Sequence, residues 1–362
     1  MKTMLTMLAL AASAALAPPA AAGETPPSPY AVVDTGQVRT YNDRTEIACP
    51  QPGEAFFGQD AHYRGRQPAY RDNGDGTVSD LNTGLMWQAD PGEKVAYDRA
   101  VAGAAVCSTG GYDDWRLPTI KELYSLILFS GTDPDPRARD TAKQRPFIDT
   151  RYFNFRYGDP SRGERVIDSQ WATSTLYVDA VMNGREAMFG VNFADGRIKG
   201  YPTDSGPGGT TKTYYARFVR GNPDYGTNDF VDHRDGTITD NATQLMWSKA
   251  DSGVGMDWQA ALDWVRQKNE ENHLGHNDWR LPDAKELQSI VDYTRSPETT
   301  GSAAIDPVFL ATEITNEAGE SDYPFYWSGT NFLRFDGTAS DAVYVAFGRG
   351  LGSMDGLNVI DV

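Results

Sequence analysis

The chain has little cysteine and little histidine, which limits the chemistry it can carry. Of its 362 residues, two are cysteines and four are histidines. Thiolate metal centres and cysteine nucleophiles are therefore disfavoured. His273 and His276 have a spacing seen in zinc sites, but no further ligand lies near them in the sequence. The sequence also has no nucleophile elbow, Walker loop or dinucleotide-binding fingerprint. Classical catalysis has little support.

Positive charge is also scarce. The chain has 33 Lys and Arg against 50 Asp and Glu, a formal net charge of −17. Such a surface repels the phosphate backbone of nucleic acids and the headgroups of anionic membranes. We therefore expect no nucleic-acid partner.

Long apolar runs are absent except at the start of the chain. Lys2, the run from Leu5 to Leu16 and the small residues Ala20–Ala22 have the order of a secretory signal peptide. The run is too short to span a bilayer. We expect residues 1–22 to be removed near Ala22, leaving a periplasmic, secreted or cell-surface protein with no transmembrane segment.

The two cysteines are expected to pair in such an oxidising compartment. Cys49 lies in a lead-in segment, residues 23–69, and Cys107 in the domain that follows. A Cys49–Cys107 disulfide would tie the lead-in to that first domain.

The chain does contain a long internal repeat. Residues 70–80 are echoed by 230–240, and the motifs Leu-Met-Trp, Trp-Arg-Leu-Pro and Lys-Glu-Leu each recur about 160 residues later. This period is the size of a whole domain, so we expect two domains, 70–221 and 230–362. The first closes with an apparent strand, Tyr214 to Arg220, for which the second has no counterpart.

The repeated motifs predict the same elements in each copy. A hairpin is followed by a helix, near Tyr97–Val106 in the first copy and Trp258–Val265 in the second. A second helix begins after each Trp-Arg-Leu-Pro. Thr119 with Glu122, and Asp283 with Glu286, have the spacing of a capping box.

These motifs allow structural and functional interpretations. Trp115 and Trp279 could read a ligand, although core positions are favoured. Arg116 and Arg280 are expected to pair with acids such as Glu122 and Glu286. The two glutamates could be general acids, but capping is the better explanation.

The first hairpin resembles a calcium loop at first sight. Asp72 and Asp75 could offer carboxylate oxygens, but glycines occupy the third and fifth positions of the loop. A plain turn is favoured, so we expect no cofactor, with calcium as the lesser alternative.

Two long loops, Ser130 to Val166 and Arg295 to Tyr323, are the best functional candidates. The first loop combines cationic and aromatic residues that are common in binding hot spots; these are Arg151, Tyr152, Phe155, Arg156 and Tyr157. The alternative is a loop that packs on its own domain.

Together, the repeated motifs resemble the C-terminal domain of the Legionella collagen-like adhesin, Lcl, long catalogued as a domain of unknown function. The resemblance covers both copies. It implies an α+β fold of two tandem C-type lectin-like domains, each with two helices and a mixed, largely antiparallel sheet. Arg-Leu-Pro followed by a capped helix is similar, more distantly, to the formylglycine-generating and sulfatase-modifying family.

The adhesin likeness implies an exported, non-enzymatic binding or adhesion module that recognises a glycan or a protein through the long loops. Two alternatives remain open. One is an enzyme-like relative of the sulfatase-modifying proteins. The other is a structural component of an envelope assembly.

Overall fold

A computed structural model describes residues 28–362 except 136, 139, 143, 182–183, 205–210, 317, 350, 355–356 and 362, and only the backbone of 181, 351–354 and 357–361. The expected signal peptide lies outside the described residues. Among the described helices, none combines the length and apolar character needed to cross a membrane.

The first domain places two short helices against two antiparallel sheets. Strands pair in the order β10-β5-β4-β3 in one sheet, and β6, β7 and β9 join β8 in the other. The elements are β3 (Tyr70–Asp72), β4 (Thr77–Asp80), β5 (Met86–Gln88), α1 (Tyr97–Ala104), α2 (Ile120–Tyr124), β6 (Gln170–Trp171), β7 (Leu176–Val181), β8 (Arg185–Asn192), β9 (Arg197–Pro202) and β10 (Val219–Arg220). Short 3-10 helices span Thr109–Gly111 and Pro160–Arg162.

The second domain repeats the order of hairpin, helix and capped helix, and its sheets then differ from those of the first domain. Its first sheet, β11-β12-β13, has no strand in the place of β10 among the described residues. The elements are β11 (Phe230–Asp232), β12 (Thr237–Asp240), β13 (Leu245–Ser248), α3 (Trp258–Glu270), α4 (Ala284–Ser289), α5 (Pro297–Thr300), β14 (Ile314–Thr315), β15 (Ser321–Asp322), β16 (Phe325–Phe332), β17 (Asp341–Ala346), β18 (Leu351–Met354) and β19 (Leu357–Asp361), with a 3-10 turn at His273–Gly275. A third helix, α5, was not expected from the sequence.

The α+β class and the two-domain organisation are confirmed. In the described parts of the chain, every pairing between named strands is antiparallel, and parallel contacts occur as isolated bridges. The sheets are therefore more uniformly antiparallel than the mixed arrangement expected.

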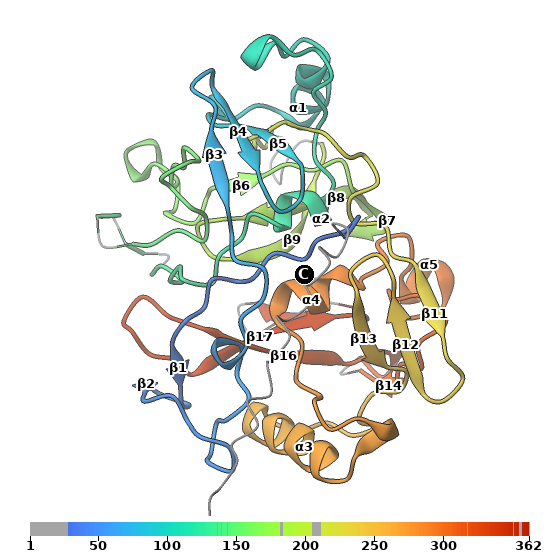
Figure 1. The fold of residues 1–362 in the computed structure, drawn as a ribbon. Helices are drawn as coiled ribbons and strands as arrows, with labels where there is room; N and C mark the ends of the chain where they lie inside the picture. Colours follow the sequence, from blue (N-terminus) through green and yellow to red (C-terminus); the bar gives the residue numbers. More distant parts are fainter. Residues whose placement is uncertain are drawn as a thin grey trace, which may run out of the picture.

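The lead-in packs along the second domain (Figure 1) and also contacts the first, where the main-chain N–H of Phe129 donates to the carbonyl oxygen of Thr35 at 2.8 Å. It contains β1 (Thr40–Tyr41), β2 (Glu46–Ile47) and a 3-10 turn at Asp60–His62. Gln37 exchanges two hydrogen bonds with the main chain of Asn331, at 2.8 and 2.9 Å. The main-chain N–H of Phe56 donates to the side chain of Gln259 on α3.

This path contradicts the expected disulfide. Both cysteines are free thiols: Cys49 is exposed and Cys107 is partly buried. Cys49 belongs to the segment that packs on the second domain, whereas Cys107 follows α1 in the first. The expectation was wrong because the lead-in contributes noncovalent contacts to the domain without cysteine.

The two domains share a core. One cluster of buried side chains joins Leu123 and Phe147 of the first domain to Ala284 and Phe332 of the second. The rings of Phe147 and Phe332 stack with centroids 5.6 Å apart. Helices α2 and α4 also lie against one another at this interface. The repeat therefore folds as one packed body.

Candidate functional site

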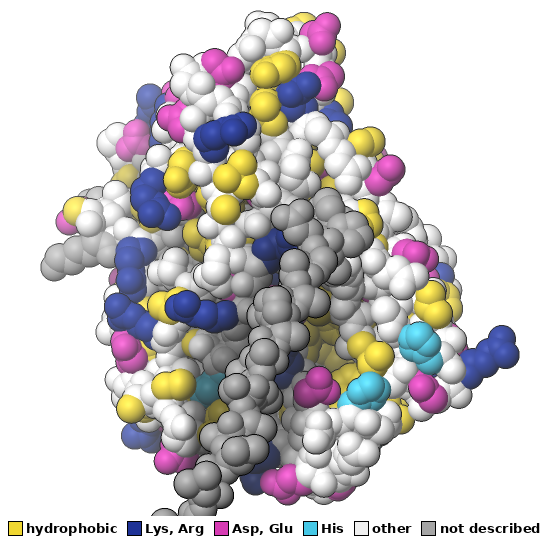
Figure 2. Space-filling model, viewed as in Figure 1, with side chains coloured by type: hydrophobic (Ala, Val, Ile, Leu, Met, Phe, Trp, Pro, Cys, Tyr) yellow, Lys and Arg dark blue, Asp and Glu magenta, His cyan; other side chains and the backbone are white. Residues whose placement is uncertain are grey.

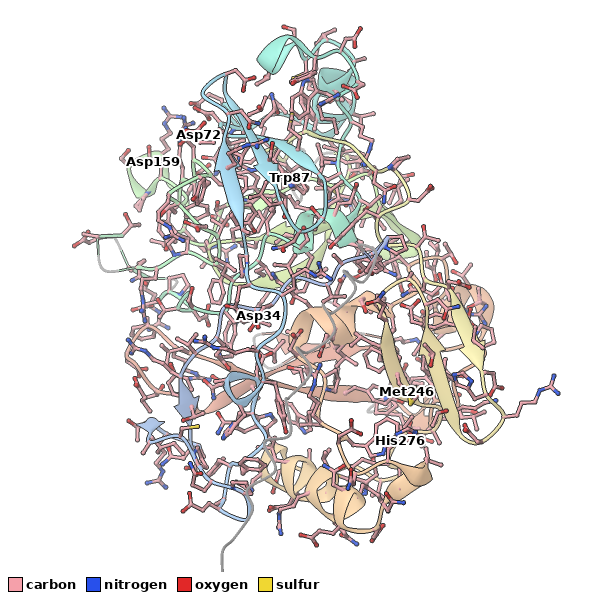
Figure 3. The ribbon with its side chains drawn as sticks, viewed as in Figure 1. Asp34, Asp72, Trp87, Asp159, Met246 and His276 are labelled. Carbon is pink, nitrogen blue, oxygen red and sulfur yellow. The ribbon has the colours of Figure 1, made fainter. Side chains whose placement is uncertain are left out.

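A groove with a volume of about 890 Å³ opens in the second domain between β13, α3, the start of α4 and β16. Its walls are largely apolar and include the aromatic residues Trp247, Trp264, Trp279, Phe309, Phe325 and Trp327. Figure 2 shows hydrophobic side chains next to histidines in the lower half of the molecule, and Figure 3 places Met246 and His276 between the β11–β13 sheet and α3.

In the first domain the same place is filled by the chain itself. Residues 214–220 run between β5 and β6. Val219 pairs with Trp87 on β5. On the other side, the N–H of Tyr215 donates to Gln170 at 3.0 Å and its carbonyl accepts from Ala172 at 2.9 Å. This segment closes the first domain.

The groove is open because the described residues supply no such segment to the second domain. Trp87 and Trp171 are completely buried in the first domain. Their counterparts, Trp247 and Trp327, are only partly buried and line the groove. Met246, on the unpaired edge of β13, is 43% exposed. These tryptophans are thus core residues in the first domain, while in the second they form part of the groove wall.

The Arg and Glu side chains of the repeated motifs around α2 and α4 have structural roles, as the sequence favoured. Arg116 pairs with both carboxylate oxygens of Glu122, and Arg280 does the same with Glu286, at 2.5 Å. Both glutamates complete capping boxes, the first with Thr119 and the second with an aspartate. Their carboxylates are thus engaged twice, once by a guanidinium and once by a helix N-terminus.

The two Trp-Arg-Leu-Pro tryptophans lie in different surroundings. Trp115 is buried, and its indole N–H donates to Thr109 O. Trp279 lines the groove, its indole N–H donates to His273 O at 2.9 Å, and the rings of His273 and His276 pack against it edge-on. The two histidines therefore contact an aromatic ring.

Acidic and hydroxyl groups provide polarity at one end of the groove. Asp251 accepts hydrogen bonds from the hydroxyl of Tyr326 and the main chain of Thr312, both at 2.7 Å. Burial, together with the Asp251 carboxylate, raises the pKa of Tyr326. An apolar groove with a few fixed polar groups is typical of binding sites.

The five loop residues that the sequence predicted to bind a ligand in the first domain do not form one exposed patch. Arg151 forms a bidentate pair with neighbouring Asp149, and Arg156 bonds to Glu93 at 2.9 Å. The three aromatic residues pack inward on their own domain: Tyr152 on Tyr70, Phe155 on Trp171, and Tyr157 on Phe155. The loop that carries these residues therefore packs on its own domain.

Asp72 and Asp75 serve the hairpin turn. Asp72 accepts from the N–H of Gly74, and Asp75 from the N–H and hydroxyl of Thr77. The side-chain bond from Thr77 contributes most to lowering the pKa of Asp75. Among the described residues there is no cluster of three or more His, Cys, Asp or Glu suited to a metal ion.

Sequence reasoning did not find the groove. The available signal was the missing counterpart of residues 214–220 in the second copy. The groove does include part of the second long loop, since Ile305, Phe309 and Leu310 line it.

Comparison with known proteins gives one family. The model of the Lcl C-terminal domain matches twice, over residues 76–220 and 236–357. No curated protein and no solved structure matches the chain.

Proposed function

The chain belongs to the Lcl C-terminal domain family, and we propose that it is an exported, non-enzymatic binding module whose ligand site is the groove of the second domain. The observation that carries this proposal is the open, aromatic-walled groove of about 890 Å³. Within the described chain, the second domain leaves large apolar side chains accessible where the first domain buries their counterparts, which is characteristic of interaction sites.

The proposed export follows from the signal-like first 22 residues. A C-type lectin-like fold is part of the same proposal, supported by the order of hairpin, helix, capped helix, long loop and late strands in each copy. In this proposal the second long loop contributes one wall of the site, and the first supports its own domain.

A non-enzymatic role is supported by the chemistry of the groove. Glu286 is held by Arg280 and by the N-terminus of α4, and Asp251 by four donors. Carboxylates bound in this way are poorly placed to exchange protons with a substrate. The aromatic side chains of the groove are better suited to binding a ligand by packing against it.

The test is a screen of the mature protein on glycan and peptide arrays, first with calcium and then with chelator. Leu310→Glu places a charge on an exposed lining residue and should weaken binding at least tenfold. Val231→Glu, an exposed residue of β11 outside the groove lining, should leave binding unchanged. No binding by folded protein on either array, or equal binding by both variants, would contradict the proposal.

A further inference from the structure

We infer that the groove binds an arginine-containing β-strand of a different protein, which pairs with the free edge of β13. This inference rests on the proposed binding function and specifies its ligand class. Its basis is that the first domain contains an occupied version of the same groove.

In that occupied version, Arg217 is the anchor. Its guanidinium is fully buried. It donates to the carbonyl oxygens of Gln88 and Ala89 and, at 2.7 Å, to that of Asn154. Burial lowers its pKa to about 9, although the Asp90 carboxylate opposes this shift. Three main-chain carbonyls therefore accept hydrogen bonds from the two terminal nitrogens of this cation, while its buried Nε has no hydrogen-bond partner among the described residues.

The aromatic walls around the arginine recur in the second domain. The guanidinium carbon of Arg217 lies 5.0 Å from the ring centre of Phe153 and 4.9 Å from that of Trp171. Phe309 and Trp327 occupy the corresponding places and line the groove. Phe153 and Phe309 each pack edge-on against the first residue of their domain's first strand, at 5.0 and 5.2 Å.

The carbonyl arrangement recurs as well. In the first domain the N–H of Asn154 bonds to Ala89 O at 2.9 Å, and in the second that of Leu310 bonds to Lys249 O at 2.8 Å. With the preceding Ser248, these residues line the groove. The second domain therefore has the framework of an arginine site, and guanidinium groups are well matched to carbonyl oxygens and aromatic faces.

Main-chain groups are also available to an incoming strand. In the first domain the N–H and C=O of Arg116 both bond to Val219, at 2.9 Å. The corresponding Arg280 has no main-chain hydrogen bond with another described residue. Together with the edge of β13, it offers the pairing surface used in β-strand addition.

The charge and the side-chain sizes of the groove lining restrict which residues the ligand strand can carry. Arg220 pairs with Asp114 in the first domain, and the equivalent Asp278 lines the open groove. The helix residue facing this segment differs between the domains. Phe218 packs over Gly103 of α1, whereas the residue of α3 at the same distance from the helix N-cap is the much larger Trp264. The ligand strand should carry two arginines three residues apart, with a small residue after the first.

The described chain has no segment free to fill this role. Residues 214–220 are held in the first domain, where Tyr214 and Arg217 are completely buried. The β18 and β19 strands pair with one another. The acidic chain, with a net charge of −17, favours a basic partner.

The experiment uses fluorescently labelled peptides with the sequence of residues 213–221, titrated with the mature protein. Three peptides are compared: the natural sequence, one with Phe218→Ala and one with Arg217→Ala. Protein variants Asp278→Asn and Asp114→Asn form a matched pair, because only Asp278 lines an open groove. Hydrogen exchange of residues 244–250 reports strand pairing directly.

We expect the Phe218→Ala peptide to bind at least as well as the natural one, and the Arg217→Ala peptide at least about tenfold more weakly. Asp278→Asn should weaken binding several-fold and Asp114→Asn should not. Exchange at 244–250 should slow on binding. Failure of both arginine peptides to bind, binding that ignores Arg217, or a groove closed by a second copy of this chain would overturn the inference. If these peptides fail while an array ligand remains sensitive to Leu310→Glu, the binding function stands and only its ligand class is wrong.

Discussion

Lys121 and Lys285 make reciprocal hydrogen bonds across the interface between the two domains. The ammonium nitrogen of Lys121 donates to the carbonyl oxygen of Ser289, and that of Lys285 donates to the carbonyl oxygen of Ser125, both at 2.8 Å. The repeated Lys-Glu-Leu motif therefore joins α2 to α4 with near-twofold symmetry.

This interface predicts a stability that rises at alkaline pH. Burial lowers the pKa of both lysines to about 8, although nearby aspartates oppose the shift. Between pH 8 and the ordinary lysine value near 10.4, the unfolded chain holds protons that the folded chain has released, so the free energy of unfolding increases with pH. The increase should be on the order of 2–3 kcal/mol per lysine. Urea unfolding of the native protein and of Lys285→Met at several pH values checks this, since the variant should lose its share of the rise. Equal slopes for the two proteins would contradict it.

Asp60 predicts the opposite dependence at acid pH. Burial raises its pKa to about 6, in spite of hydrogen bonds from Thr330 and Thr35. The folded state binds the proton more tightly than the unfolded state, so stability falls as pH rises from about 4 to about 6. Asp60→Asn should remove this fall and raise the free energy of unfolding at pH 7 by on the order of 1–3 kcal/mol. Thermal unfolding between pH 4 and 7 measures it. A destabilised variant at pH 7 would show that the carboxylate is needed.

Gln37 should be important for the second domain although it precedes the first. Its buried side-chain amide accepts from the N–H of Asn331 and donates to the C=O of the same residue. Gln37→Leu leaves both buried groups unsatisfied and should cost about 1–3 kcal/mol. Gln51→Leu, at an exposed lead-in position, is the control and should change stability by less than about 0.5 kcal/mol. Equal effects would mean that the lead-in does not stabilise the second domain.

Two glycines should respond oppositely to alanine. A Cβ at Gly131 would lie 2.6 Å from the ring of Phe147, whereas one at Gly255 would meet nothing within 4 Å. Gly131→Ala should destabilise by about 1–3 kcal/mol through overpacking. Gly255→Ala should be neutral or stabilising by up to about 1 kcal/mol, because it restricts the unfolded chain. Denaturant midpoints compare them, and similar midpoints would refute the close approach.

The cysteines should titrate as thiols. Cys49 is exposed and should react with Ellman's reagent at once, while the partly buried Cys107, which lies 3.1 Å from the Gln88 amide nitrogen, should react more slowly. In denatured protein both thiols should react quickly, and in the native protein Cys49→Ser should remove the fast phase of the reaction. Detection of no thiol after denaturation would restore the disulfide expected from sequence.

The sequence by itself determined the local structure of this protein. Turn residues placed the hairpins, and Thr119 and Asp283 placed the helix starts, because capping and turn formation depend on groups a few residues apart. The repeat likewise predicted two domains and the Arg–Glu pairs. Tertiary structure alone decided where the lead-in packs, which is why the expected Cys49–Cys107 bond is absent. It also decided that the Leu-Met-Trp and Trp-Arg-Leu-Pro tryptophans are core in one domain and groove wall in the other. The same side chains are buried or accessible according to whether residues distant in the sequence cover them, and near-identical local motifs contain no information about that contact.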